Sequence, residues 1–119
     1  MSYSNPLTAV YRFPAATVST AAVVGRIVGP KGLSGTVVGI GSVVTTGVTV
    51  AASSITVGSA SSASAYATAA VPVSGANAVA NDFTPVANHV IAPDEVVNVA
   101  AGGEATAGAA DLLVMINWY

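Results

Sequence analysis

The chain has 119 residues, of which 7% are charged and 53% are hydrophobic, and its formal net charge is −2. This length fits one domain, and the apolar content excludes the low-hydrophobicity, high-charge composition of disordered chains. The absence of cysteine excludes disulfides and thiolate metal sites, and three basic residues are too few for a nucleic-acid surface. Glycine, serine and threonine interrupt every apolar run, so we predict no membrane span. We also predict no cofactor.

The first part of the chain divides into an arm and a series of strands. Pro6 and Pro14 interrupt residues 1–19, which are predicted to form an N-terminal arm, and residues 20–119 are predicted to form a single β domain. Runs of β-branched residues predict strands over residues 20–29, 35–46, 47–51 and 54–58. The glycines and proline of residues 29–32 predict a turn between the first two of these strands.

The second part of the chain has weaker signals until its end. The alanine- and serine-rich residues 59–70 are interpreted as a loop followed by a strand over residues 66–73, with a short helix as the alternative. Residues 74–88 and 102–108 are predicted to be loops. Further strands are expected over residues 89–91, 95–101 and 111–119. The total is seven to eight short strands, a pattern typical of an antiparallel sandwich or barrel.

The last strand carries apolar side chains on both faces. Alternation places Leu112, Val114, Ile116 and Trp118 on one face, which is the predicted core face. Leu113 and Met115 lie on the opposite face and are also apolar. An antiparallel strand usually keeps one polar face, so this second face must be covered, either by a partner subunit or by another loop of the same chain.

Five of the seven aromatic residues lie near the ends of the chain. Ends of a chain usually fray unless they are tied down. Large rings at these positions therefore predict that both ends are anchored, either on the protein's own core or on a neighbour. These residues are Tyr3, Tyr11, Phe13, Trp118 and Tyr119.

Few groups are available for catalysis. His89 is the single histidine, and no Gly-x-Ser-x-Gly motif accompanies it. Asp94 and Glu95 are adjacent, so on a strand they would point to opposite faces and would not form a carboxylate pair. The glycine turn at residues 29–32 lacks the spacing and the hydroxyl residue of a phosphate-binding loop. The Gly-Ile-Gly segment at residues 39–41 is interpreted as a bend in a strand. We therefore predict a protein without enzymatic activity.

The few charges are distributed unevenly. The bases Arg12, Arg26 and Lys31 all lie in the first 31 residues, and all five acids lie from residue 82 onward. If the fold separates these regions, the molecule has a basic and an acidic patch that favour oriented docking. The alternative is a set of solvated loop charges with no directional role.

Several of these features together resemble one protein family. Residues 26–32, Arg-Ile-Val-Gly-Pro-Lys-Gly, precede Gly35 and a valine-rich strand that ends in Val44-Thr45-Thr46. Val57-Gly58, then Ala65-Tyr66-Ala67, a glycine-rich hairpin and the terminal Asn117-Trp118-Tyr119 follow. In these residues the chain resembles the capsid cement, or decoration, proteins of tailed bacteriophages over residues 20–119. That family more often has an acid before the terminal tryptophan, where this chain has Asn117.

The resemblance implies a jelly-roll-like β protein that is made in the host cytoplasm and sits on the outer capsid surface of the virion. It implies two partners, the major capsid protein and the chain itself as a homodimer or homotrimer. The alternative is a tail, fibre or glycan-binding module, for which the loop residues Asn77, Asn81, Asp82, Phe83 and Asn88 are candidates. The predicted partner-binding residues are Tyr3, Tyr11, Arg12, Phe13, Arg26, Lys31, Leu113, Met115, Trp118 and Tyr119.

Overall fold

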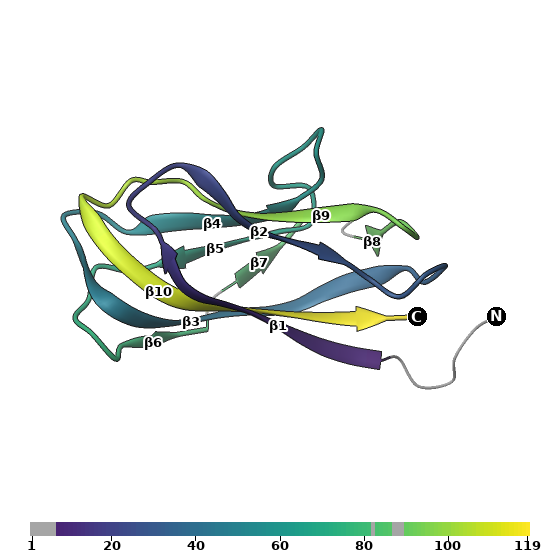
Figure 1. The fold of residues 1–119 in the computed structure, drawn as a ribbon, viewed down its shortest axis with the longest axis horizontal. Coiled ribbons are helices and arrows are strands. Elements are labelled where there is room, and N and C mark those ends of the chain that lie inside the picture. The colour runs from purple at the N-terminus through teal and green to yellow at the C-terminus, as the bar shows by residue number, and fades with distance from the viewer. Residues whose placement is uncertain (1–6, 82, 87–89) are drawn as a thin grey trace.

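The computed structural model describes residues 7–81, 83–86 and 90–119, and within these ranges the chain forms strands and turns without a helix. Two antiparallel sheets pack face to face (Figure 1). The first sheet has the order β1 (Leu7–Thr17), β10 (Ala107–Trp118), β3 (Gly35–Thr49) and β6 (Val79–Ala80), and β8 (Val90–Ile91) also pairs with β3. The second has the order β2 (Ala22–Val28), β9 (Val96–Ala101), β4 (Ser53–Gly58), β5 (Ala67–Val71) and β7 (Phe83–Pro85). The predicted antiparallel all-β class is confirmed, and neither sheet is closed.

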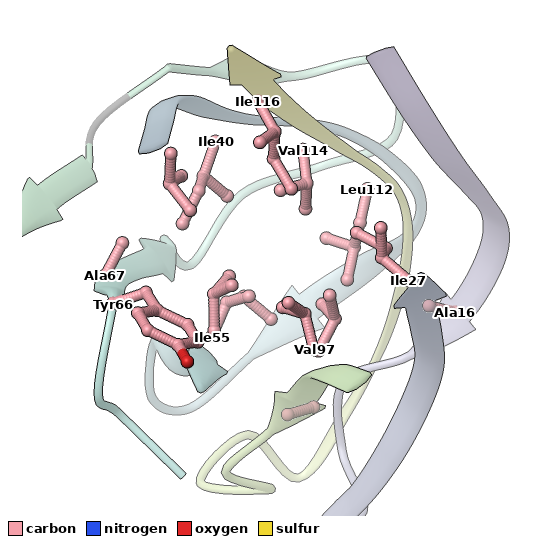
Figure 2. Packing of buried hydrophobic residues seen from close by; sticks show 14 of the residues in the cluster. Ala16, Ile27, Ile40, Ile55, Tyr66, Ala67, Val97, Leu112, Val114 and Ile116 are labelled. Atoms are coloured by element: carbon pink, nitrogen blue, oxygen red, sulfur yellow. The ribbon is translucent and has the colours of Figure 1, made fainter. Parts of the chain in front are cut away.

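The core lies between the inner faces of the two sheets. Leu112, Val114 and Ile116 of β10 are fully buried, and Trp118 is 2% exposed, as predicted from their alternation. Figure 2 shows Leu112, Val114 and Ile116 on the side of the core that faces Ile55 and Val97 of the second sheet. The core is built almost entirely from aliphatic side chains, which matches a composition poor in aromatic residues.

Residues 7–17, which we assigned to an arm, form the edge strand β1. The strand pairs with β10 from Leu7 opposite Trp118 to Thr17 opposite Ala109. Pro14 does not prevent this pairing, because it lies in a bulge between Phe13 and Ala16 on an edge strand. Proline is tolerated at such positions, where no ladder hydrogen bond is required.

Other boundaries also differ from those predicted. The described residues contain ten strands rather than seven or eight. Three strands were not predicted, namely β1 in the expected arm and the short β6 and β7 in the loop expected over residues 74–88. Residues 35–49 form one strand, since Gly47 does not end the pairing with β10, which continues to Thr49 opposite Ala107. The expected loop followed by a strand after residue 59 is confirmed by β5.

The ring of Trp118 depends on two glycines of the sequence motif. A Cβ atom at Gly29 would lie 2.4 Å from a ring atom, and one at Gly35 would lie 2.5 Å from another. The indole Nε1 donates a hydrogen bond to the Tyr11 hydroxyl at 2.9 Å, so the one polar atom of the buried ring is satisfied. Tyr119 continues this anchoring, since its backbone exchanges two hydrogen bonds with Ser34. The C-terminal end is therefore anchored on the protein itself.

A second set of contacts joins the turns at the opposite end of the sandwich. The buried Ser53 hydroxyl donates to the Val18 carbonyl and accepts from the Ala105 N–H at 3.2 Å. Glu104 accepts hydrogen bonds from the Ser54 hydroxyl at 2.7 Å and from the Ser54 N–H at 2.9 Å, and these bonds, the first above all, lower the pKa of its carboxyl. These bonds hold three connections together: the one after β1, the one before β4 and the one between β9 and β10.

The substitution Gly29→Ala is expected to destabilise the fold by about 1–3 kcal/mol, because the added methyl group overpacks the Trp118 ring. Gly75→Ala is the matched control, since a Cβ at Gly75 meets no atom within 4 Å. Urea unfolding followed by tryptophan fluorescence measures both. Equal midpoints for Gly29→Ala and Gly75→Ala would show that the ring does not depend on Gly29.

The substitution Ser53→Ala is expected to lower the free energy of unfolding by about 1–3 kcal/mol, because it leaves the Val18 carbonyl and the Ala105 N–H unsatisfied in the interior. Ser61→Ala, in the exposed loop after β4, serves as the control. Thermal unfolding by circular dichroism gives the comparison, and an unchanged midpoint for Ser53→Ala would contradict the bridging role of Ser53.

Candidate functional site

The outward face of the first sheet carries an apolar patch. The sheet register aligns Val10 of β1 with Met115 of β10 and Gly39 of β3, and it aligns Arg12 with Leu113 and Gly41 in the next row. Met115 lies across Gly39, because a Cβ at that glycine would come within 2.5 Å of the Met115 methyl group. We call the four side chains Val10, Val38, Leu113 and Met115 the outer apolar face.

The outer apolar face is open to solvent in the described part of the chain. Val10 is 58% exposed and Val38 is 40% exposed, while Leu113 and Met115 are half-buried within the sheet surface. No loop within residues 7–81, 83–86 and 90–119 covers Val10 or Val38, as these exposures show. The predicted apolar second face of the last strand is therefore present, and β1 and β3 extend it.

An ion pair borders the outer apolar face at one corner. Arg12 Nη2 lies 2.7 Å from Asp111 Oδ2, and Asp111 Oδ1 accepts a hydrogen bond from the Ala15 N–H at 2.7 Å. Ala15 has a positive φ of 49° and lies in the β1 bulge, so Asp111 holds this bulge in place. The Ala15 N–H and, next, the Arg12 guanidinium lower the pKa of the Asp111 carboxyl.

The fold does not separate the basic first part of the chain from the acidic second part. Arg12 pairs with Asp111, and the Gly32 N–H, next to Lys31, donates to Asp94 Oδ1 at 3.3 Å. Both contacts arise because distant segments meet, through the pairing of β1 with β10 and through two turns at the same end. Arg12 and Asp111 therefore do not belong to separate basic and acidic patches.

The predicted partner-binding residues fall into several separate places. Tyr11 and Phe13 lie on the inner face of β1 and pack against the core, with the Phe13 ring over Gly25, and Trp118 is buried. Arg26 is exposed on β2, and Lys31 is exposed in the turn that follows β2.

The remaining predicted partner-binding residues lie close to β10. Tyr119 is 41% exposed, and its hydroxyl lies 3.2 Å from the Thr36 hydroxyl. Leu113, Met115 and Arg12 share one surface, the outward face of the first sheet. Tyr3 lies outside the described residues.

The acidic residues considered for catalysis have structural partners. Asp94 has a positive φ of 63° and accepts from the Gly32 N–H, and Glu95 accepts from the Ala92 N–H at 3.3 Å. Burial, followed by a hydrogen bond to Glu95, raises the pKa of the Tyr66 hydroxyl. His89 lies outside the described residues. Within the described ranges, no group of three histidine, cysteine or acidic side chains is placed to hold a metal ion.

The candidate glycan loop is divided between the two sheets. Residues 79–80 pair with β3 in the first sheet, and Phe83 belongs to β7 in the second. Asn77 has a positive φ of 71° and donates its N–H to the Val44 carbonyl, so it forms a turn. Asp82 and Asn88 lie outside the described residues. The described members of this group therefore do not belong to one loop, because β6 and β7 divide them between the two sheets.

Val10 and Val38 were missed as candidate binding residues. Val10 alternates with Thr8 and Arg12, so a strand interpretation of residues 7–17 would have indicated it. Alternation along the strand does not indicate Val38, because its outward direction depends on a register shift between β3 and β10 near Met115.

Comparison with known proteins gives no relative: no family model, curated protein or solved structure matches this chain. In the described ranges, no helix is long and apolar enough to cross a membrane.

The substitution Asp111→Asn is expected to destabilise the protein at neutral pH, because it removes the carboxylate that pairs with Arg12 and holds the β1 bulge. The folded pKa of Asp111 is below its usual value of 3.8, so this stabilisation is present above that pH and is lost as the pH falls through the folded pKa. The difference between wild type and variant, measured by urea unfolding, should therefore shrink below pH 3.8. A difference that stays constant down to about pH 2 would contradict this role.

Proposed function

We propose that this chain is a capsid cement protein, which binds the outer surface of a tailed-phage head, bridges neighbouring capsomers of the major capsid protein and stabilises the shell. The observation that carries the proposal is the outer apolar face, a solvent-exposed patch on the face of a sheet whose ends are held by specific contacts. Exposed apolar patches of this kind mark protein interaction sites. The resemblance in the Arg26–Gly32 segment and in Asn117–Tyr119 is the reason for proposing the major capsid protein as the partner.

The rigidity of the sheet supports a mechanical role. The C-terminal strand β10 is paired on both sides, and its Trp118 ring is enclosed by Gly29, Gly35 and Tyr11. A preorganised surface loses little conformational entropy on binding, so more of the contact energy appears as affinity. Many copies of a weak contact then add up over the shell through multivalency.

The proposal includes the fold detail and the assembly that the resemblance implies. The two sheets would correspond to a jelly-roll-like sandwich, and the protein would self-associate as a homodimer or homotrimer on the shell. Its activity is binding and requires no catalytic group or cofactor. Of the predicted contact residues, Arg12, Leu113 and Met115 remain the best candidates, because they lie on or beside the outer apolar face.

The first test is the copy number of this chain in purified particles of the phage that encodes it, measured by quantitative mass spectrometry. We expect a number comparable to that of the major capsid protein, because a cement protein covers the shell. A few copies per particle would instead favour a tail or fibre component. Absence from the particles would refute the virion proposal.

A second experiment tests the surface. Particles stripped of this protein are incubated with the wild type, with Val10→Glu/Val38→Glu, or with the control Val28→Glu, whose valine is 62% exposed on β2. We expect the double variant to lose binding, since it places two charges in an apolar contact, while the control binds as the wild type does. Equal binding by all three proteins would exclude the outer apolar face as the contact.

A further inference from the structure

The edge strand β1 has one side along which its backbone groups meet no partner strand. In the described ranges the first sheet ends at β1, which pairs with β10 on its other side only. The first part of β1, in purple, runs along the lower border of the molecule in Figure 1. Its register against β10 is continuous from Leu7 to Phe13, so this part is a regular strand. A regular unpaired edge is a template for pairing with another strand.

The hydrogen bonds at the end of the chain determine which residues of β1 face the unpaired side. Ser34 and Tyr119 exchange two backbone hydrogen bonds, so Tyr119 directs its N–H and C=O groups to the side of β3. Backbone groups of successive strand residues alternate in direction, so Trp118 directs its own towards β1, where it pairs with Leu7. The same alternation along β1 directs the backbone groups of every second residue after Leu7 away from β10. These residues, which we call the free edge, are Thr8, Val10 and Arg12.

The other edges of the two sheets are short or interrupted. β6 and β8 have two residues each, and β7 has three. The pairing of β2 with β9 contains a register shift between Val23 and Gly25. Short strands and bulges are features that keep sheet edges from pairing with other chains. Among the described strands, β1 therefore offers the longest regular edge.

The free edge ends at Arg12 in the direction of the C-terminus. Pro14 has no N–H group, and the bulge of β1 begins after Phe13. A partner strand therefore meets a regular ladder of donors and acceptors only before Pro14. Arg12 carries the one charge of the free edge, and this charge restricts how two such edges can be placed together.

The free edge is complementary to itself. When two copies of β1 lie antiparallel with Val10 opposite Val10 of the second copy, Thr8 of each copy lies opposite Arg12 of the other. Each N–H and C=O group of the free edge then meets a partner group from the free edge of the other copy.

Neighbouring registers are less favourable. A register centred on Tyr11 places Thr8 opposite Pro14, which has no N–H to donate. A register centred on Arg12 places two guanidinium groups directly opposite each other, and like charges in this position are destabilising. Hydrogen bonding and charge therefore favour a second copy of this chain as the occupant, paired about Val10.

Pairing about Val10 also covers apolar surface. Residues that lie opposite each other in an antiparallel pair direct their side chains to the same face. The two Val10 side chains, each 58% exposed in the single chain, would therefore contact each other on the outward face of the first sheet. The outer apolar faces of the two copies would become one continuous surface.

We propose that this chain forms a two-fold symmetric dimer in which the free edges of two β1 strands pair antiparallel about Val10. The contact is isologous, because both copies use the same surface, and it closes at the dimer. The inference rests on the self-association included in the proposed function and names its contact. It concerns the free protein and does not require a shell.

The first test removes one donor from the free edge. Val10→Pro deletes an N–H that faces away from β10, so the fold is expected to remain while dimerisation weakens at least about tenfold. Val10→Thr is the matched control, since it keeps the N–H and the β-branched shape and is expected to dimerise as the wild type does. Sedimentation velocity of the purified chain over a range of concentrations measures the dissociation constants, and urea unfolding checks the fold. A wild type that stays monomeric, or a folded Val10→Pro that dimerises normally, would overturn the proposal.

The second test examines the register and does not depend on whether Val10→Pro folds. Residue 8 of each copy lies opposite Arg12 of the other, so Thr8→Glu is expected to tighten the dimer at least about twofold. Thr8→Lys is expected to weaken it by a similar factor, and both effects should shrink at high salt. Equal dissociation constants for Thr8→Glu and Thr8→Lys would overturn the pairing about Val10.

Val38→Glu separates dimerisation from shell binding. Val38 lies on β3, and β10 separates it from the free edge, so this variant is expected to dimerise normally while losing binding to stripped particles. Dimerisation that is lost in Val38→Glu and retained in Val10→Pro would place self-association on the outer apolar face and refute the edge contact. A dimer that responds to the variants as expected, from a protein absent from phage particles, would refute the proposed function and leave the edge contact standing.

Discussion

The pairing of β10 on both of its edges is the constraint on which the rest of the structure depends. β1 occupies one edge and β3 the other, so the last strand of the chain becomes an interior strand of the first sheet. Its inner side chains form the main wall of the core, and its outer side chains form the centre of the outer apolar face. Because alternate residues of a strand point to opposite faces, one strand serves both stability and the proposed binding surface.

The protein has few charged residues, and several of its acidic side chains hold turns in place. Asp111, Glu104 and Asp94 each accept hydrogen bonds from backbone N–H groups of distant segments. Ser53 performs a similar task in the interior with a neutral hydroxyl. The few polar side chains are thus used to fix connections between strands, while the apolar side chains on the outside remain available for contacts.

Among the described residues, the outer apolar face lies outside the core. The outer apolar face is a broad patch on a sheet, as expected for contact with a large partner surface.

Local pattern was enough to predict the class of the fold and much of its core. The alternation in residues 111–119 predicted the buried face of β10, and β-branched runs predicted β2, β4 and β9, because both signals arise from the residues of a single strand. The strand status of residues 7–17 could not be predicted in this way, because Pro14 is acceptable only where a bulge on an edge strand removes the need for its missing N–H. The short strands β6 and β7 likewise exist only because a neighbouring strand lies beside them.

The candidate site was likewise predicted only in part from local pattern. Leu113 and Met115 were predicted to lie on a second apolar face from their own strand, but Val10 and Val38 join them only through the register of β1 and β3 against β10. The pairing of Arg12 with Asp111 and the enclosure of Trp118 by Gly29 and Gly35 also require segments far apart in the chain to meet. By itself, therefore, the sequence determined which residues prefer strands and which faces are apolar, since these are local properties. Tertiary structure alone decided which faces meet, which charges neutralise each other and which apolar side chains stay outside, because these depend on the order and register of strands in the sheets.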